Sequence, residues 1–184
     1  MSLLFLSEYI KDIRSVGAIA PSSRFLARKM VESVDFGKAR VIIEYGPGMG
    51  AFTAEIVKRM VPGTKLLVVE TNPTFYNKLH ARYKGMKDIE IINASAEYIG
   101  LLHAERELPI PDYVISGLPF AALPARVSAA ILEATVKLLG KEGEFITFQY
   151  TLLKKGLLSS FFRDIQVARE LRNVPPAYIL RCRQ

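Results

Sequence analysis

The sequence is poor in the residues that build disulfides and metal sites, and it has no long apolar run. Among its 184 residues there are one cysteine, two histidines and no tryptophan. Cys182 alone cannot form an internal disulfide, and His80 and His103 add too few ligands for a structural zinc site. No apolar run approaches the roughly 18 residues of a membrane-spanning helix, and the N-terminus lacks the features of a secretory signal. We therefore expect a cytoplasmic protein without transmembrane helix, secretory signal or structural metal.

The composition supplies enough apolar material for one folded core. Half of the residues are hydrophobic, 23% are charged and the mean hydropathy is +0.19. Such a balance offsets the entropy of the chain and argues against disorder. The length is that of about one domain, and no internal repeat, low-complexity tract or Gly/Ser linker divides it. We expect residues 1–184 to form a single domain.

The middle of the chain has no net positive charge, and the positive excess lies at the two ends. Residues 1–30 carry a net charge of +3, residues 150–184 carry +5, and residues 31–149 carry −1, which together make the net +7. If the two ends meet on one face, that face would attract nucleic acid or an anionic lipid surface. A scattered basic surface is the third interpretation, and charge alone does not choose among them.

Apolar strand-like runs alternate with helical patterns through most of the chain. The predicted strands cover 41–45, 64–70, 89–92, 112–116 and 143–150, and helices ending near 60, 83, 103 and 139 separate them. This alternation predicts a parallel sheet covered by helices on both faces. Residues 163–172 and 177–183 lack a full helix between them, which predicts an antiparallel pair at one edge. The expected fold is a doubly wound α/β fold with a seven-stranded, mostly parallel sheet, which binds ligands at the carboxyl ends of its strands.

The N-terminus has a different pattern, typical of an amphipathic helix. Its apolar residues at helical spacing are Leu3, Leu6, Tyr9, Ile10, Ile13 and Val16. Such a helix either packs on its own sheet or lies in a membrane interface. Pro21-Ser22-Ser23 predicts the start of a second helix that runs to about Ser33. Residues 1–33 are therefore expected to form a helical cap or a membrane-contacting segment.

A glycine-rich turn follows the first predicted strand, within VIIEYGPGMGAFT at 41–53. Gly46, Gly48 and Gly50 let the backbone turn tightly and approach a ligand that side chains would exclude. Glu70 ends the next strand, twenty residues beyond Gly50, where a carboxylate can accept both hydroxyls of a ribose. Together these features predict the site of a small, ribose-containing cofactor.

Glu44 lies inside an otherwise apolar strand. A carboxylate buried there needs hydrogen-bond donors, which the amino end of a bound ligand or nearby backbone amides would supply. Exposure at the edge of the sheet is the alternative, since most acidic residues are exposed.

Across nearly the whole chain, the sequence resembles class I S-adenosylmethionine-dependent methyltransferases. The resemblance rests on the E-x-G-x-G-x-G pattern at 44–50, on the acid that closes the second strand and on the alternating topology. The resemblance implies that S-adenosylmethionine is the cofactor and S-adenosylhomocysteine the product. It implies that the glycines and Glu44 surround the methionine part, that Glu70 holds the ribose, and that residues 93–97 flank the adenine. The implied cofactor-binding residues are Glu44, Gly46, Gly48, Gly50, Glu70, Thr71, Ser95 and Ala96.

The segment after the fourth strand resembles an acceptor loop for amines, and its residues are Ser116, Gly117, Leu118, Pro119 and Phe120. Ribosomal RNA adenine dimethylases typically have Asn-Leu-Pro-Tyr here, in which the Asn grips the planar amine and the aromatic ring stacks on the base. This chain keeps Leu-Pro-Phe but has Gly117 in place of the Asn. Loss of that polar grip disfavours a nucleobase as acceptor.

Three segments resemble the bacterial phospholipid N-methyltransferases, namely VGAIAPSSRFLARKM at 16–30, SGLPF at 116–120 and NVPPAYILRC at 173–182. This resemblance implies methylation of phosphatidylethanolamine toward phosphatidylcholine, at the inner face of a membrane on which the N-terminal helix rests. An RNA adenine N6-methyltransferase, a small-molecule methyltransferase and a non-catalytic cofactor-binding protein remain alternatives. The sequence indicates no oligomeric state.

If the acceptor is a lipid amine, an aromatic ring is expected to hold the methylated ammonium product. Phe120 is the first candidate, and Tyr9 and Tyr178 are further ones. Basic residues near the ends of the chain are expected to contact an anionic bilayer. These are Lys11, Arg14, Arg24, Arg28, Lys29, Lys154 and Lys155.

Overall fold

The computed structural model describes residues 23–152 and 155–184. The predicted N-terminal amphipathic helix, with Tyr9, Lys11 and Arg14, lies outside these residues, as does Lys154. The second predicted helix is present as α2, Arg24–Met30. The hydroxyl of Ser23 caps it by accepting a hydrogen bond from the Leu26 amide, which satisfies one of the free donors of the first turn.

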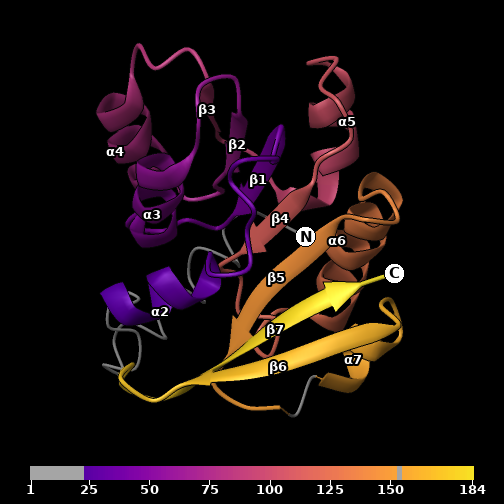
Figure 1. The fold of residues 1–184 in the computed structure, drawn as a ribbon. Coiled ribbons are helices and arrows are strands. Elements are labelled where there is room, and N and C mark those ends of the chain that lie inside the picture. Colours follow the sequence, from indigo (N-terminus) through magenta and orange to yellow (C-terminus); the bar gives the residue numbers. More distant parts are fainter. Residues whose placement is uncertain (1–22, 153–154) are drawn as a thin grey trace.

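A seven-stranded sheet forms the centre of the molecule, in the order β3-β2-β1-β4-β5-β7-β6 (Figure 1). Its strands are β1 Val41–Tyr45, β2 Lys65–Val69, β3 Ile89–Ile92, β4 Tyr113–Ser116, β5 Glu144–Gln149, β6 Asp164–Glu170 and β7 Ala177–Arg183. The first five pair in parallel, whereas β7 pairs antiparallel with both β5 and β6. The predicted doubly wound fold is confirmed. Within the antiparallel pair, β6 forms the edge and the C-terminal strand β7 lies one position inside it.

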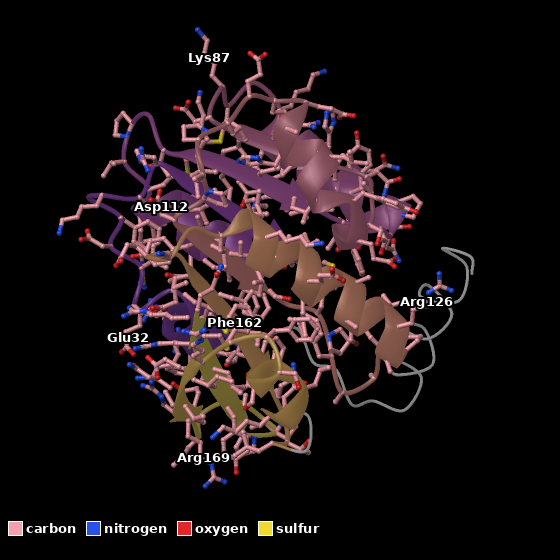
Figure 2. All side chains as sticks on the ribbon, turned by 90° about the vertical axis from the view of Figure 1, so that its right-hand side faces the viewer. Glu32, Lys87, Asp112, Arg126, Phe162 and Arg169 are labelled. Carbon is pink, nitrogen blue, oxygen red and sulfur yellow. The ribbon has the colours of Figure 1, made fainter. Side chains whose placement is uncertain are left out.

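Helices cover both faces of this sheet (Figure 1 and Figure 2). They are α3 Ala51–Arg59, α4 Pro73–Tyr83, the 3₁₀ helix η1 Ala96–Tyr98, α5 Ile99–Ala104, α6 Ala125–Leu138 and α7 Lys155–Ser159. One apolar core joins α2, α3 and α4 to Ile42 of β1, and the other joins α5, α6 and α7 to Ile43. Consecutive residues of a strand thus serve opposite cores, which is why β1 is buried along its whole length. No helix among the described residues has the length and apolar character needed to cross a bilayer.

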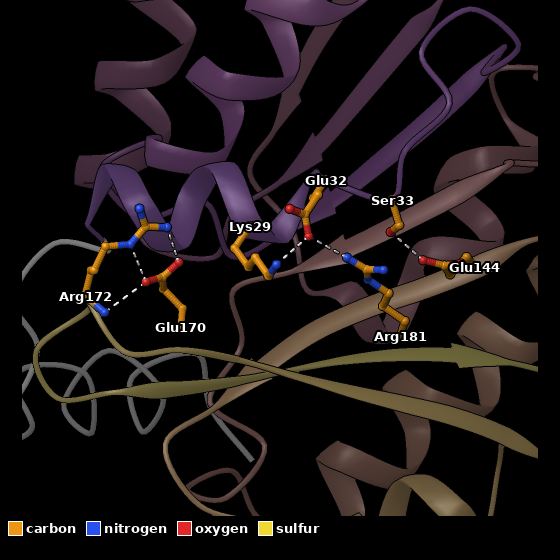
Figure 3. A network of polar contacts seen from close by, with 7 residues as sticks. All are labelled: Lys29, Glu32, Ser33, Glu144, Glu170, Arg172 and Arg181. Atoms are coloured by element: carbon orange, nitrogen blue, oxygen red, sulfur yellow. Dashed lines mark hydrogen bonds and ion pairs between the residues drawn. The ribbon is translucent and has the colours of Figure 1, made fainter.

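Side-chain contacts fasten α2 to the antiparallel part of the sheet (Figure 3). Glu32 accepts from Lys29 at 2.7 Å and from Arg181 of β7 at 3.1 Å. The Ser33 hydroxyl donates to the buried carboxylate of Glu144, the first residue of β5, at 2.7 Å. The segment before the first parallel strand is therefore held against the last strands of the chain.

The parallel register brings the loops after β1, β2 and β4 to one edge. Tyr45, the last residue of β1, is aligned with Val69 of β2 and with Ser116 of β4. The loops that follow these three residues carry the predicted glycine turn, Glu70 and the acceptor loop. Because β1 lies between β2 and β4, all three groups of residues meet at the point where the strand order reverses.

Candidate cofactor and acceptor site

The glycine turn after β1 has a backbone that other residues rarely adopt. Gly46, Gly48 and Gly50 have φ values of 60°, 56° and 82°. A Cβ atom at Gly46 would lie 2.6 Å from a methyl carbon of Leu118, so this glycine also permits close packing of two loops. At Gly48 no atom lies within 4 Å of the Cβ position, which leaves open space against the backbone. The turn is thus closely packed at Gly46 and has open space beside Gly48.

Glu70, directly after β2, fastens this turn. Its carboxylate is buried and accepts hydrogen bonds from the amide of Gly48 at 3.0 Å and from the amide of Asn72 at 2.8 Å. Asn72 in turn caps α4, where Pro73 occupies the first turn. The residue predicted to hold a ribose therefore lies beside the glycine turn, at the start of a helix.

Glu44 is fully buried inside β1. The alternative prediction, that it is exposed at the edge of the sheet, is wrong. Among the described residues, neither of its carboxylate oxygens has a hydrogen-bond partner, and the hydroxyl of Thr53 in α3 is likewise unpaired. Burial raises the pKa of Glu44 to about 8; the nearby Thr53 hydroxyl and amide oppose this shift, and the charge of Glu70 adds to it. A carboxylate in this condition requires a donor or a cation from a ligand.

A small, mostly apolar hollow lies next to the turn. It brings together four of the predicted cofactor residues, Gly46, Thr71, Ser95 and Ala96. Two further lining residues also belong to predicted segments, since Leu118 was predicted for the acceptor loop and Ala94 lies in the segment 93–97 predicted to flank the adenine. The sequence did not single out the remaining ones, which are Val69, Leu123, Val127 and Ile131. Several of them belong to α6 or directly precede it, where their apolar spacing is the same as that of ordinary core residues. The hollow has the apolar walls and the few polar groups that suit a flat heterocycle.

The acceptor loop contacts the glycine turn backbone to backbone. The amide of Gly117 donates to the carbonyl of Tyr45 at 2.8 Å. A Cβ atom at position 117 would lie 2.5 Å from the carbonyl oxygen of Gly46, so no side chain fits there while the two loops keep this distance. The Ser116 hydroxyl accepts from the Leu118 amide at 3.2 Å and tightens the turn. The glycine that replaces the Asn of the adenine dimethylases is therefore required by this local geometry.

The expectation that Phe120 offers its ring to an amine is not met in this structure. The ring is 1% exposed and packs edge-on against Phe145, with the ring centres 6.0 Å apart. The apolar core under α6 takes up the ring, because burial there removes it from water. Tyr178, the other described candidate, is half-buried and has the guanidinium of Arg169 over its ring at 5.2 Å.

Residues 22–157 match the family model of ribosomal RNA adenine dimethylases. The chain belongs to this family. The family match, together with the fold and the site, confirms that the chain is an S-adenosylmethionine-dependent methyltransferase and that S-adenosylmethionine is its methyl donor.

Similar proteins act on different acceptors. The ornithine lipid N-methyltransferase of Singulisphaera acidiphila is 28% identical over 182 residues, which cover 98% of this chain and 94% of that protein. The probable ribosomal RNA small subunit methyltransferase A of Methanosarcina barkeri is 26% identical over 110 residues, 60% of this chain but only 34% of that protein. Among solved structures, the N-methyltransferase NodS from Bradyrhizobium japonicum, in complex with S-adenosyl-L-homocysteine, has a TM-score of 0.66 at 12% identity and 87% coverage of both chains.

The described residues fit the cofactor that the family requires. The orphaned oxygens of Glu44 suit the ammonium of its methionine part, and the open backbone at Gly48 leaves room for its chain. Glu70 lies beside the glycine turn and directly before Thr71, which lines the hollow, and the apolar walls of the hollow suit the adenine.

Replacing Glu70 by alanine is expected to raise the dissociation constant for S-adenosylmethionine by about 10- to 150-fold, the equivalent of roughly 1.5–3 kcal/mol for hydrogen bonds to a charged group. Isothermal titration calorimetry measures this change, and Glu133→Ala, which removes an exposed acid that pairs with Lys137, serves as the control. An unchanged dissociation constant for Glu70→Ala would remove this residue from the cofactor site.

The cofactor-free protein is expected to lose stability as pH rises from about 5 to about 8. In this window folded Glu44 keeps a proton that the unfolded chain releases, so the free energy of unfolding falls by roughly 3–5 kcal/mol. Glu44→Gln stays neutral and should remove most of this slope, whereas Glu133→Gln should keep it. Urea unfolding at several pH values measures the slope, and equal slopes for wild type and Glu44→Gln would show that Glu44 ionises normally.

Proposed function

We propose that this enzyme transfers methyl groups to the amine of a membrane lipid head group. The observation that carries this proposal is the contact between position 117 and the Gly46 carbonyl. It leaves no room for the side chain that grips a planar base in the adenine dimethylases. A primary amine on a flexible head group needs no such grip, because it can approach along the loop backbone. The alignment with an ornithine lipid N-methyltransferase over nearly the whole of both chains supports the same acceptor class.

Two head groups are considered. Phosphatidylethanolamine, methylated toward phosphatidylcholine, follows from the resemblance to phospholipid N-methyltransferases, and ornithine lipid follows from the relative in Singulisphaera acidiphila. Both present a primary alkyl amine at the surface of a bilayer. We place phosphatidylethanolamine first, because three separate segments of the sequence resemble that family.

In this proposal the predicted residues hold the cofactor as follows. Glu44 accepts from the ammonium of the methionine part, the turn from Gly46 to Gly50 lies along it, and Glu70 accepts from the ribose hydroxyls. Ser95 and Ala96 flank the adenine, together with the apolar wall from α6. When bound, S-adenosylmethionine supplies a methyl group on a positively charged sulfur.

The task of the acceptor loop is to hold the amine nitrogen in line with the methyl–sulfur bond at near-contact distance. With S-adenosylmethionine bound, the head-group ammonium would first lose a proton to solvent, and its nitrogen would then take the methyl group as the carbon–sulfur bond breaks and S-adenosylhomocysteine leaves. An alkyl amine titrates near 10, like lysine, so it must be deprotonated before it attacks. The largely apolar surroundings of Leu118 and Pro119 favour the neutral amine over the cation by desolvation.

We further propose that the enzyme is peripheral on the inner face of a membrane. Of the basic residues expected to contact lipid, Arg24, Arg28 and Lys29 lie on α2, and Lys155 begins α7. Both arginines and Lys155 are exposed. Each basic side chain near an anionic surface contributes about 1 kcal/mol, which is enough for reversible attachment.

Methylation of adenine in ribosomal RNA is the second candidate function. The family match and the relative in Methanosarcina barkeri favour it. It would require the base to be held without a side chain at position 117, which weakens binding of its polar edge.

Transfer of labelled methyl groups in four parallel reactions tests these functions. The acceptors are vesicles of phosphatidylethanolamine with anionic lipid, vesicles of ornithine lipid with anionic lipid, small subunit ribosomal RNA, and free ethanolamine. Label is expected in a lipid fraction. Label in RNA alone would establish the second candidate, and equal label in free ethanolamine with no effect of vesicles would make the enzyme a small-molecule methyltransferase.

Gly117→Asn is expected to lower kcat/KM for the lipid acceptor by about 10- to 100-fold without creating activity on RNA. The added side chain meets the Gly46 carbonyl, and overpacking of this kind costs about 1–3 kcal/mol. Gly100→Asn is the control, since Gly100, like Gly117, is not among the glycines with positive φ, and no atom lies within 4 Å of its Cβ position. Full lipid activity in Gly117→Asn, or a gain of RNA methylation, would contradict the specificity argument.

A further inference from the structure

The turn between β6 and β7, residues 171–176, is named the hairpin tip here. It exposes two large apolar side chains, Leu171 at 65% and Val174 at 80%. Single exposed apolar residues are common on protein surfaces. A pair at the end of one hairpin, beside arginines, is a combination typical of interaction surfaces.

The hairpin tip projects at the same edge of the sheet as the acceptor loop. Tyr178 of β7 is aligned with Gln149, the last residue of β5, so the residues before Ala177 extend beyond the carboxyl end of that strand. The neighbouring strand β4 ends at Ser116, aligned with Thr147, and continues into the acceptor loop. Figure 1 shows the β6–β7 turn next to α2, at the lower left of the molecule.

Polar contacts give the hairpin tip a fixed shape. Asn173 is buried, its side-chain oxygen accepts from the Ser23 amide at 3.2 Å, and its side-chain nitrogen donates to the Pro175 carbonyl at 2.7 Å. The tip is thereby tied to the start of α2. Leu171 and Val174 flank Arg172 and Asn173. These hydrogen bonds fix the shape of the turn in which both apolar side chains are exposed.

Arginines lie within the hairpin and at the start of α2, to which the hairpin tip is tied. Arg172 binds the buried carboxylate of Glu170 through two nitrogens at 2.9 Å each, as Figure 3 shows, and its guanidinium lies 4.5 Å from the ring centre of Phe25. Arg24 lies over the same ring at 5.0 Å. Arg169, which points outward at the lower end of Figure 2, and Arg24 form no ion pair within the described part of the chain. The surface therefore combines an apolar apex with uncompensated positive charge.

We infer that the hairpin tip and the start of α2 form a docking surface for an anionic lipid bilayer. Leu171 and Val174 enter the boundary between head groups and acyl chains, while Arg24 and Arg169 face lipid phosphates. An RNA backbone would match the arginines but would leave the apolar pair in water, so the bilayer is the better partner. The choice of partner rests on the proposed lipid substrate. Docking here places the acceptor-loop edge of the sheet toward the head groups.

Vesicle sedimentation without methyl donor tests this surface. The full chain is expected to bind vesicles of phosphatidylcholine with phosphatidylglycerol, which contain no amine acceptor. The double variant Leu171→Ser/Val174→Ser should bind them at least about tenfold more weakly, because two apolar side chains no longer leave water. The matched control is Leu101→Ser/Ile110→Ser, whose residues are exposed by 67% and 60% on α5 and before β4; it should bind as wild type does.

Arg24→Gln/Arg169→Gln should weaken binding to the anionic vesicles by about fivefold per arginine and leave binding to pure phosphatidylcholine unchanged. Thermal unfolding and cofactor affinity verify that each variant is folded. The inference would be overturned if Leu171→Ser/Val174→Ser bound vesicles as wild type does, or if Leu101→Ser/Ile110→Ser lost as much binding. It would also be overturned if the full chain did not bind vesicles.

The docking surface and the proposed function can fail separately. If vesicle binding depends on the hairpin tip but the chain methylates no lipid, the docking surface stands and the proposed function is rejected. If the chain methylates detergent-dispersed lipid but does not bind vesicles, the proposed function stands and the docking surface is rejected.

Discussion

The close contact between the backbones after β1 and β4 is the constraint on which the site depends. Gly117 donates to Tyr45, and its missing side chain lets the Gly46 carbonyl approach. This contact sets the distance between the glycine turn, which is predicted to bind the cofactor, and the loop predicted to bind the acceptor. Parallel pairing of β4 with β1 makes the contact possible, because both strands end at the same level. One backbone contact thus links the sheet topology to the acceptor class that we propose.

Much of the fold could be predicted because buried parallel strands consist of short runs of β-branched and other apolar residues, and β1 to β5 stand out in this way. The short helix α7 was not predicted, since five residues are too few to show a helical period. The position of β7 between β5 and β6 could not be predicted either, because an antiparallel pair can join a sheet through either of its strands.

The candidate site could be proposed from the sequence where the chemistry requires unusual residues, as in the glycine turn and at Glu70, and the structure places these two side by side. It was not predictable where the residues are ordinary. Val127 and Ile131 line the hollow but have the type and spacing of any buried helical residue. The orientation of Phe120 depends on how the turn after Pro119 packs against Phe145, which is a tertiary contact between distant parts of the chain.

The hydrogen bonds of Glu70 have a further consequence for ligand binding. Its carboxylate accepts from the amides of Gly48 and Asn72, so hydrogen bonds within the protein hold the turn and the start of α4 together. Ordering a flexible loop on binding would subtract from affinity, whereas here the entropy is lost during folding. A turn held in this way is preorganised, and less of a ligand's contact energy is spent on ordering it.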